Sequence, residues 1–135
     1  MPTKFDEGLS VMGGQSSDSG PPLAPYTQVG EMIFVSGQVP IDPATGETRA
    51  GNIAVQTEQV LANLRGVVES AGATVDDIVK TTVFMTDISQ LAEMNAAYRL
   101  FFSNTALPSR SAVQVAALAR GDWQIEIEAV AIGAK

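Results

Sequence analysis

The chain has 135 residues, of which 45% are hydrophobic and 17% charged, a balance typical of one globular domain and not of a disordered chain. It contains no cysteine and no histidine, which excludes thiolate and imidazole chemistry and the commonest metal ligands, so no metal site is expected. The 15 acidic and 8 basic residues give a net charge of −7, and this argues against nucleic acid as a partner because phosphate binding rests on Lys and Arg.

Residues 1–22 predict an irregular amino-terminal arm, and residues 23–135 a single domain. The arm ends in GGQSSDSGPP, a run of small, polar and turn-forming residues. The chain begins without an apolar targeting segment, and it nowhere holds eighteen consecutive apolar residues. We therefore expect a soluble, cytoplasmic protein with no membrane partner.

The first half of the domain predicts two strands, a loop and a helix. Residues 26–35 are rich in β-branched and aromatic residues and are interrupted by Gly30, which indicates two short strands joined by a tight turn. The segment SGQVPIDPATGE, residues 36–47, indicates a loop of successive turns. Residues 53–71 carry apolar side chains at spacings of three and four, so they predict an amphipathic helix, with Gly72 as its left-handed C-cap.

The second half predicts a strand, a helix and two further strands. Residues 77–86 alternate and are rich in Val and Thr, which indicates a strand. Ser89 is a good N-cap for a helix whose apolar residues within 91–102 face inward. SRSAVQVAAL, residues 109–118, and WQIEIEAVAI, residues 123–132, predict two strands that pair as a hairpin.

The order β-β-α-β-α-β-β predicts an α+β sandwich, with two helices on one face of a mixed sheet. We expect this sheet to be six-stranded, with one strand more than the five in that order. The other face then needs either polar residues or a partner. In the last strand Gln124, Glu126 and Glu128 oppose an apolar row, and the preceding strand offers small apolar and polar residues on one face. Such a mixture is typical of an oligomer surface or a pocket, so we expect a homo-oligomer.

Arg110 stands near the start of LPSRSAVQVAAL, an otherwise apolar stretch. A guanidinium stays charged, so it needs water or an anion, and the small neighbour Ala112 leaves room for a carboxylate ligand. Pattern alone favours an ion pair with Glu126 or Glu128 on the adjoining strand, because paired surface arginines outnumber anion-binding ones. Whether Arg110 and Glu126 share a sheet face depends on the length of the turn, which the sequence leaves open.

Four other positions have both a structural and a functional interpretation. Glu126 fits a solvated sheet face, but covered by a subunit it would have a raised pKa and could relay protons. Ser36 and Gly37 could bring a hydroxyl and backbone N–H groups to a ligand, or could simply let the strand turn. Tyr26 fits a pocket wall or a strand edge equally well. Asn95 lies on a mostly buried helix face, where holding a loop is commoner than holding a substrate.

Several segments together resemble a known family. They are, in chain order, APYTQ, VSGQVPIDPATGE, VVESAGATVDDIVKTTVFMTD, MNAAYRLFF, LPSRSAVQVAAL and IEIEAVAI. In this order they resemble the reactive intermediate deaminase (Rid) family, also called the YjgF or liver perchloric-acid-soluble protein (L-PSP) family. The resemblance runs from about Pro25 to Ile132.

The resemblance implies a chorismate-mutase-like α+β fold in a homotrimer, in which the sheets form an inner barrel and three active sites lie in clefts between subunits. It implies cofactor-independent hydrolysis of reactive enamines and imines, such as 2-aminoacrylate and its tautomer 2-iminopropionate, to 2-oxo acids and ammonia. The implied activity is that of a 2-iminobutanoate/2-iminopropanoate deaminase, with a small imino, enamino or 2-oxo acid as its ligand.

Roles carry over position by position. The resemblance implies that Arg110 binds the substrate carboxylate and that Glu126 orients or activates water, with Glu128 as the alternative because the preceding turn is about one residue longer than in close relatives. Many members have a cysteine where this chain has Ala112, so thiol-dependent reactivity is not expected. The implied substrate-binding positions are Tyr26, Ser36, Gly37, Asn95 and Ala112.

Two other classes of function stay open at this point. A non-enzymatic small-ligand-binding or chaperone-like trimer could use the same cleft. Some members of the family have been described as endoribonucleases, but the acidic charge and the missing histidine disfavour that activity here.

Overall fold

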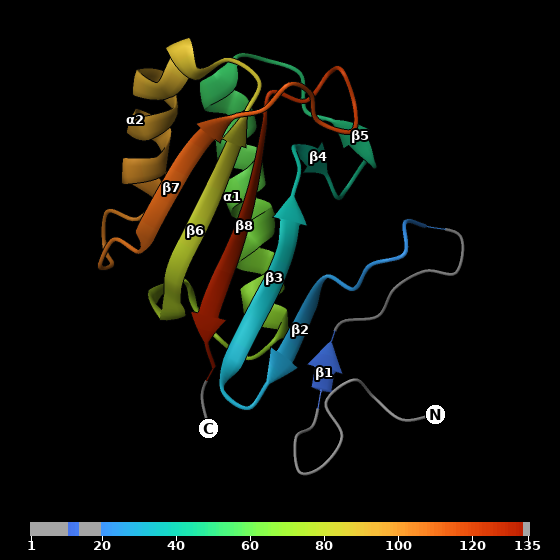
Figure 1. Ribbon diagram of the computed structural model, residues 1–135, viewed down its shortest axis with the longest axis vertical. Helices are drawn as coiled ribbons and strands as arrows, with labels where there is room; N and C mark the ends of the chain where they lie inside the picture. Colours follow the sequence, from blue (N-terminus) through green and yellow to red (C-terminus); the bar gives the residue numbers. More distant parts are fainter. Residues whose placement is uncertain (1–10, 14–19, 134–135) are drawn as a thin grey trace.

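The computed structural model describes residues 11–13 and 20–133, and a six-stranded sheet forms its centre (Figure 1). Antiparallel pairing joins all neighbouring strands except β6 and β7, which are parallel. The sheet order is β1-β2-β3-β8-β6-β7. Its strands are β1 (Val11–Gly13), β2 (Tyr26–Val29), β3 (Met32–Gln38), β6 (Ile78–Met85), β7 (Ser109–Gln114) and β8 (Ile125–Ile132).

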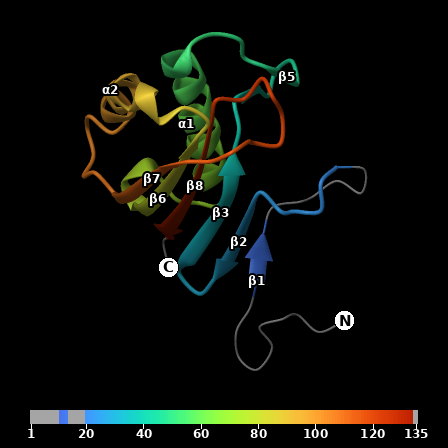
Figure 2. The ribbon, with the colours of Figure 1, turned by 45° about the horizontal axis from the view of Figure 1, so that its top comes forward.

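Two helices, α1 (Ile53–Ser70) and α2 (Leu91–Phe101), cover the same face of this sheet (Figures 1 and 2). The predicted first helix is confirmed, and Gly72 follows it with a φ of 86° in the left-handed region. The α+β sandwich with a mixed sheet is therefore confirmed. The core lies between the helices and the sheet; its fully buried side chains include Ile33, Leu61, Leu64, Val83, Met94 and Ile127.

Short elements complete the fold. The expected turn between the first two strands is confirmed at Gly30, where φ is 59°. The predicted loop after β3 contains a small two-stranded sheet, β4 (Ile41–Asp42) and β5 (Glu47–Thr48). Short 3-10 helices, η1 (Val75–Asp77) and η2 (Ile88–Gln90), precede β6 and α2. In the described part of the chain, no helix has the length and apolarity needed to cross a membrane.

The predicted hairpin between the last two strands is wrong. β7 pairs in parallel with β6, and β8 lies between β3 and β6. The segment from β6 through α2 to β7 is a β-α-β crossover, which naturally makes parallel neighbours. In its central place β8 completely buries Ile125 and Ile127, which stabilises the sheet more than an edge position would.

Two smaller expectations also need correction. Ser89 is not the N-cap of the second helix, because α2 begins at Leu91 after the 3-10 turn η2. The carboxylate of Asp87 caps that turn, and it accepts hydrogen bonds from both the backbone N–H and the hydroxyl of Ser89, at 3.0 and 2.6 Å. In the arm expected to be irregular, β1 pairs with β2, while residues 1–10 and 14–19 lie outside the described residues.

The sheet face away from the helices exposes large apolar side chains. Met32 and Phe34 on β3 are 41% and 44% exposed, and Val113 on β7 is 43% exposed. Their chain neighbours at alternate positions point the other way, and Ile33 is completely buried under the helices. Exposed apolar side chains on one face are typical of a surface that contacts another subunit. They support the homo-oligomer, which stays a prediction.

Candidate functional site

The two residues expected to perform chemistry lie on opposite faces of the sheet. Arg110 is opposite Thr81, which is in turn opposite Ala129, and both of these neighbours are buried beneath the helices. Glu126 is three residues before Ala129 and opposite Phe84, on the face away from the helices. Since β6 separates β7 from β8, the ion pair that the pattern favoured between Arg110 and Glu126 or Glu128 is not formed.

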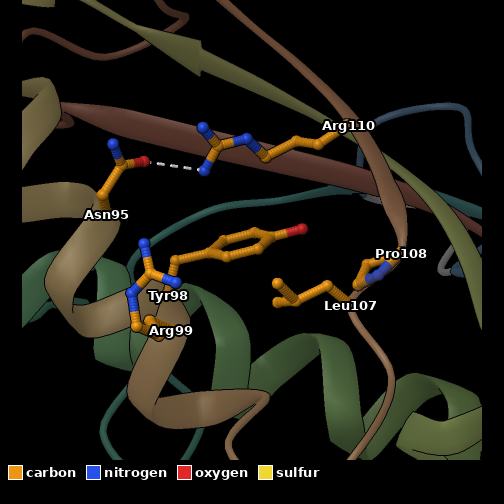
Figure 3. A pocket seen from close by; sticks show the side chains of 6 residues that line it. All are labelled: Asn95, Tyr98, Arg99, Leu107, Pro108 and Arg110. Atoms are coloured by element: carbon orange, nitrogen blue, oxygen red, sulfur yellow. Dashed lines mark hydrogen bonds between the residues drawn. The ribbon is translucent and has the colours of Figure 1, made fainter.

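Arg110 is instead held by neutral side chains of α2. Its Nη1 donates a hydrogen bond of 2.8 Å to Oδ1 of Asn95, and its guanidinium lies 4.9 Å from the ring centre of Tyr98 (Figure 3). An amide oxygen and a π face fix the orientation of the guanidinium without neutralising it. Asn95 therefore positions Arg110 and does not hold a loop.

Tyr98 is a member of this site that the sequence analysis missed. Its side chain is 4% exposed, and its hydroxyl hydrogen-bonds the buried hydroxyl of Thr81 at 2.6 Å. Burial raises the pKa of Tyr98, so it stays a neutral phenol at physiological pH. The available signal was its position three residues after Asn95, on the same helix face.

A cavity of about 170 Å³ opens beside this cluster. Figure 3 shows that α2 supplies one wall and the segment leading into β7 the other. Ala112, which was predicted to bind substrate, lies two residues beyond Arg110 on the same face of β7. It packs against the core and does not line the cavity. The lining residues are Asn95, Tyr98, Arg99, Leu107, Pro108 and Arg110.

Glu126 and Gly37 form a second cluster on the open face. Ser36 and Gly37 lie where the register between β3 and β8 shifts, and such irregularities often occur beside functional sites. A Cβ at Gly37 would collide with Oε2 of Glu126, so the missing side chain makes room for the carboxylate. Burial, and secondarily the charge of Glu128, raises the pKa of Glu126.

Ser36 and Tyr26 both have structural partners. The hydroxyl of Ser36 donates to the carbonyl of Ala24 at 2.6 Å, which ties the segment before β2 to β3. Tyr26 is opposite Val35 and packs against the core. Neither residue lines the cavity beside Arg110.

The predicted site residues thus form two groups within one chain. We call Arg110 with Asn95 and Tyr98 the arginine group, and Glu126 with Gly37 the glutamate group. In residues 11–13 and 20–133, no set of three or more Asp and Glu side chains gathers in a way that could hold a metal ion.

Comparisons with known proteins cover nearly all of the described chain. The family model described as Endoribonuclease L-PSP matches residues 17–133. A 2-iminobutanoate/2-iminopropanoate deaminase of Escherichia coli is 48% identical over 115 residues, which are 82% of this chain and 88% of the relative. The crystal structure of the E. coli YjgF gene product is similar with a TM-score of 0.80 and 43% identity, over 89% of this chain and 93% of that one. E. coli TdcF, whose structure holds bound serine, has a TM-score of 0.80 and 39% identity over 86% and 91% of the two chains.

Proposed function

Because this chain belongs to the reactive intermediate deaminase (Rid, YjgF or L-PSP) family, we propose that it hydrolyses 2-imino and 2-enamino acids such as 2-iminopropionate to 2-oxo acids and ammonia. The observation that carries the proposal is that Arg110 is oriented but keeps an unneutralised charge. Its guanidinium is oriented by Asn95 and Tyr98 at a small cavity, and no carboxylate of the described chain neutralises it. The name of the 48% identical relative supports the same activity.

Arg110 has the chemistry to hold the substrate by its carboxylate. An oriented guanidinium can give two parallel charge-assisted hydrogen bonds to a carboxylate, a contact worth about 1.5–3 kcal/mol. Water then adds its oxygen to the imine carbon, the carbon–nitrogen bond breaks, and the nitrogen leaves as ammonia. No electrons are exchanged with a second reactant, and Arg110 contributes by fixing the reacting carbon in place.

Glu126 is suited to guide the water and move a proton. A carboxyl group whose pKa is raised lies closer to neutrality, where it can both accept and return a proton. Its place on the other sheet face prevents it from reaching a substrate held by Arg110 of the same chain. The proposal therefore includes a homotrimer in which the arginine group of one subunit meets the glutamate group of its neighbour, covering the exposed apolar face.

Replacement of Arg110 tests the proposed function. The imine is generated in situ from D-alanine with an amino-acid oxidase, and the imine that remains is trapped with semicarbazide. Arg110→Ala should lower kcat/KM by about 10- to 150-fold, which corresponds to the loss of one charge-assisted carboxylate contact. Arg49→Ala is the matched control, since this arginine forms an exposed ion pair with Glu58 away from the cavity.

Three results would contradict the proposal. An Arg110→Ala protein as active as the unmodified protein would remove Arg110 from the mechanism. Carboxylate binding without turnover of any imine would indicate a binding protein. RNA cleavage that survives Arg110→Ala and repeated purification would instead favour a ribonuclease.

A further inference from the structure

The cavity beside Arg110 is lined by a second arginine, Arg99. Asn95 and Arg99 are four residues apart on α2, which places their side chains side by side, about 5–6 Å apart at Cβ. Asn95 is bonded to Arg110 from across the cavity, so the two arginines flank the same amide (Figure 3). One comes from the helix and the other from strand β7.

Arg99 differs from the other arginines in having no partner in the part of the chain that the structure describes. Within residues 11–13 and 20–133 it makes no ion pair, hydrogen bond or ring contact, and Arg110 has only neutral partners. The chain has 15 acidic residues, yet none of the described ones neutralises either cation at this cavity. The remaining arginines have partners: Arg49 with Glu58, Arg65 with Phe101, and Arg120 with Asp122.

Two neighbouring cations in one concave site repel each other unless an anion lies between them. One carboxylate on Arg110 would leave Arg99 unused, whereas an anion with two charged ends could contact both. Leu107 and Pro108 give the cavity an apolar wall that suits a short methylene chain between those ends. A volume of about 170 Å³ restricts the ligand to a small acid.

We propose that Arg99 forms a second anion-binding position, and that the preferred substrates are 2-imino acids with a second carboxylate on a side chain of one or two methylene groups. This inference rests on the hydrolytic function proposed above. Arg110 holds the carboxylate next to the imine carbon, and Arg99 holds the side-chain carboxylate. The reaction is unchanged: water adds to the imine carbon, ammonia leaves, and a 2-oxo dicarboxylic acid is released.

The test compares two imines on the full-length protein. D-aspartate and D-alanine are each oxidised in situ by an oxidase that accepts them, and kcat/KM is measured for both products. We expect the unmodified protein to prefer the dicarboxylic imine. Arg99→Gln should lower the ratio of the two kcat/KM values by about tenfold, the loss of one charge-assisted hydrogen bond. Arg99→Lys should restore part of the ratio.

Arg49→Gln is the matched control, because it removes the same charge from an exposed site away from the cavity and should leave the ratio unchanged. A preference for the alanine-derived imine, or a ratio that Arg99→Gln does not alter, would overturn the role of Arg99 while leaving the proposed hydrolysis intact. Full activity of Arg110→Ala on both imines would instead overturn the hydrolytic function itself.

Discussion

The two faces of the sheet differ in how far contacts within the chain fix and bury their side chains. On the helix-covered face, Arg110 is fixed by contacts within the chain: an amide at 2.8 Å, a ring at 4.9 Å and a buried Thr81 hydroxyl behind that ring. On the open face, Glu126 has close contact with Gly37, while Met32 and Phe34, on the same strand as Gly37, remain more than two-fifths exposed.

This difference shows what a single chain can and cannot assemble. The arginine group has what we propose for binding a carboxylate, an oriented cation beside a cavity. The glutamate group has a carboxyl with a raised pKa, but Glu126 does not line the cavity beside Arg110. Since the sheet itself separates the groups, any site that uses both needs a second copy of the chain.

The largest expected effect comes from mixing two inactive variants. Arg110→Ala and Glu126→Gln, carried on separate chains with different tags, should each be nearly inactive alone. Every mixed trimer holds the two variants in a 2:1 ratio, so about a third of its sites receive both intact groups if each site uses two neighbouring subunits. Imine hydrolysis by the doubly purified complex should therefore recover to about that fraction of the unmodified rate.

Two differently tagged copies of Arg110→Ala serve as the control for this mixing and must stay inactive. Mixed complexes as inactive as their parents would show that the two groups do not meet across an interface. Full activity of Glu126→Gln alone would remove Glu126 from the chemistry.

Gly37→Ala probes the open face alone. The added Cβ would collide with the end of the Glu126 side chain, which is flexible enough to move, so the fold should survive while the carboxylate is displaced. If Glu126 acts on the water as proposed, its displacement should lower kcat by about 10- to 100-fold. Steady-state kinetics should therefore show a lowered kcat, and thermal unfolding should show a nearly unchanged Tm.

Gly66→Ala is the matched control for this substitution, since an added Cβ at that helical glycine meets no atom within 4 Å. It should leave kcat unchanged. Equal kcat values for the two alanine variants would contradict the role given to Glu126.

Substitutions of Tyr98 probe the helix-covered face. Tyr98→Leu removes the ring beside Arg110 and should raise KM by about 2- to 30-fold, which corresponds to a cation–π contact of about 0.5–2 kcal/mol. Tyr98→Phe keeps the ring but leaves the buried Thr81 hydroxyl without its partner, so it should lower the free energy of unfolding by about 1–3 kcal/mol with little change in KM. Urea unfolding and steady-state kinetics separate the two effects. Equal KM values for the two variants would show that the ring does not position Arg110.

The sequence predicted those parts of the fold that depend on local pattern. The helix at residues 53–71 and the turn at Gly30 follow from periodicity and a left-handed backbone, and both were confirmed within a residue. The partner of β7 depends on a crossover through α2, which no local pattern reports, so the hairpin prediction failed.

The site residues, too, were predictable only where a local pattern marked them. Arg110 was conspicuous because one charge interrupted an apolar run, whereas Tyr98 has the same helical spacing as any core residue. The contact between Gly37 and Glu126 joins strands far apart in the chain, and it became visible only when the register of β3 and β8 was known.

The smallest expected effect is a shift in pH dependence on the open face. Burial raises the pKa of Glu126 and the charge of Glu128 raises it further, so Glu128→Gln should lower it. If ionised Glu126 directs the water, the acidic limb of kcat/KM should move to lower pH in this variant, and a profile that stays in place would assign that limb to another group.

The effect of Glu126 on stability has a definite sign. Because its pKa is raised in the folded protein, the stabilising contribution of the neutral carboxyl is present below the ordinary glutamate pKa and is lost as the pH rises through the raised value. Glu126→Gln should therefore raise Tm at neutral pH, and this gain should vanish in acid. A gain in Tm of the same size at both pH values would mean that the amide packs better at this position, and that the charge of Glu126 does not destabilise the folded protein.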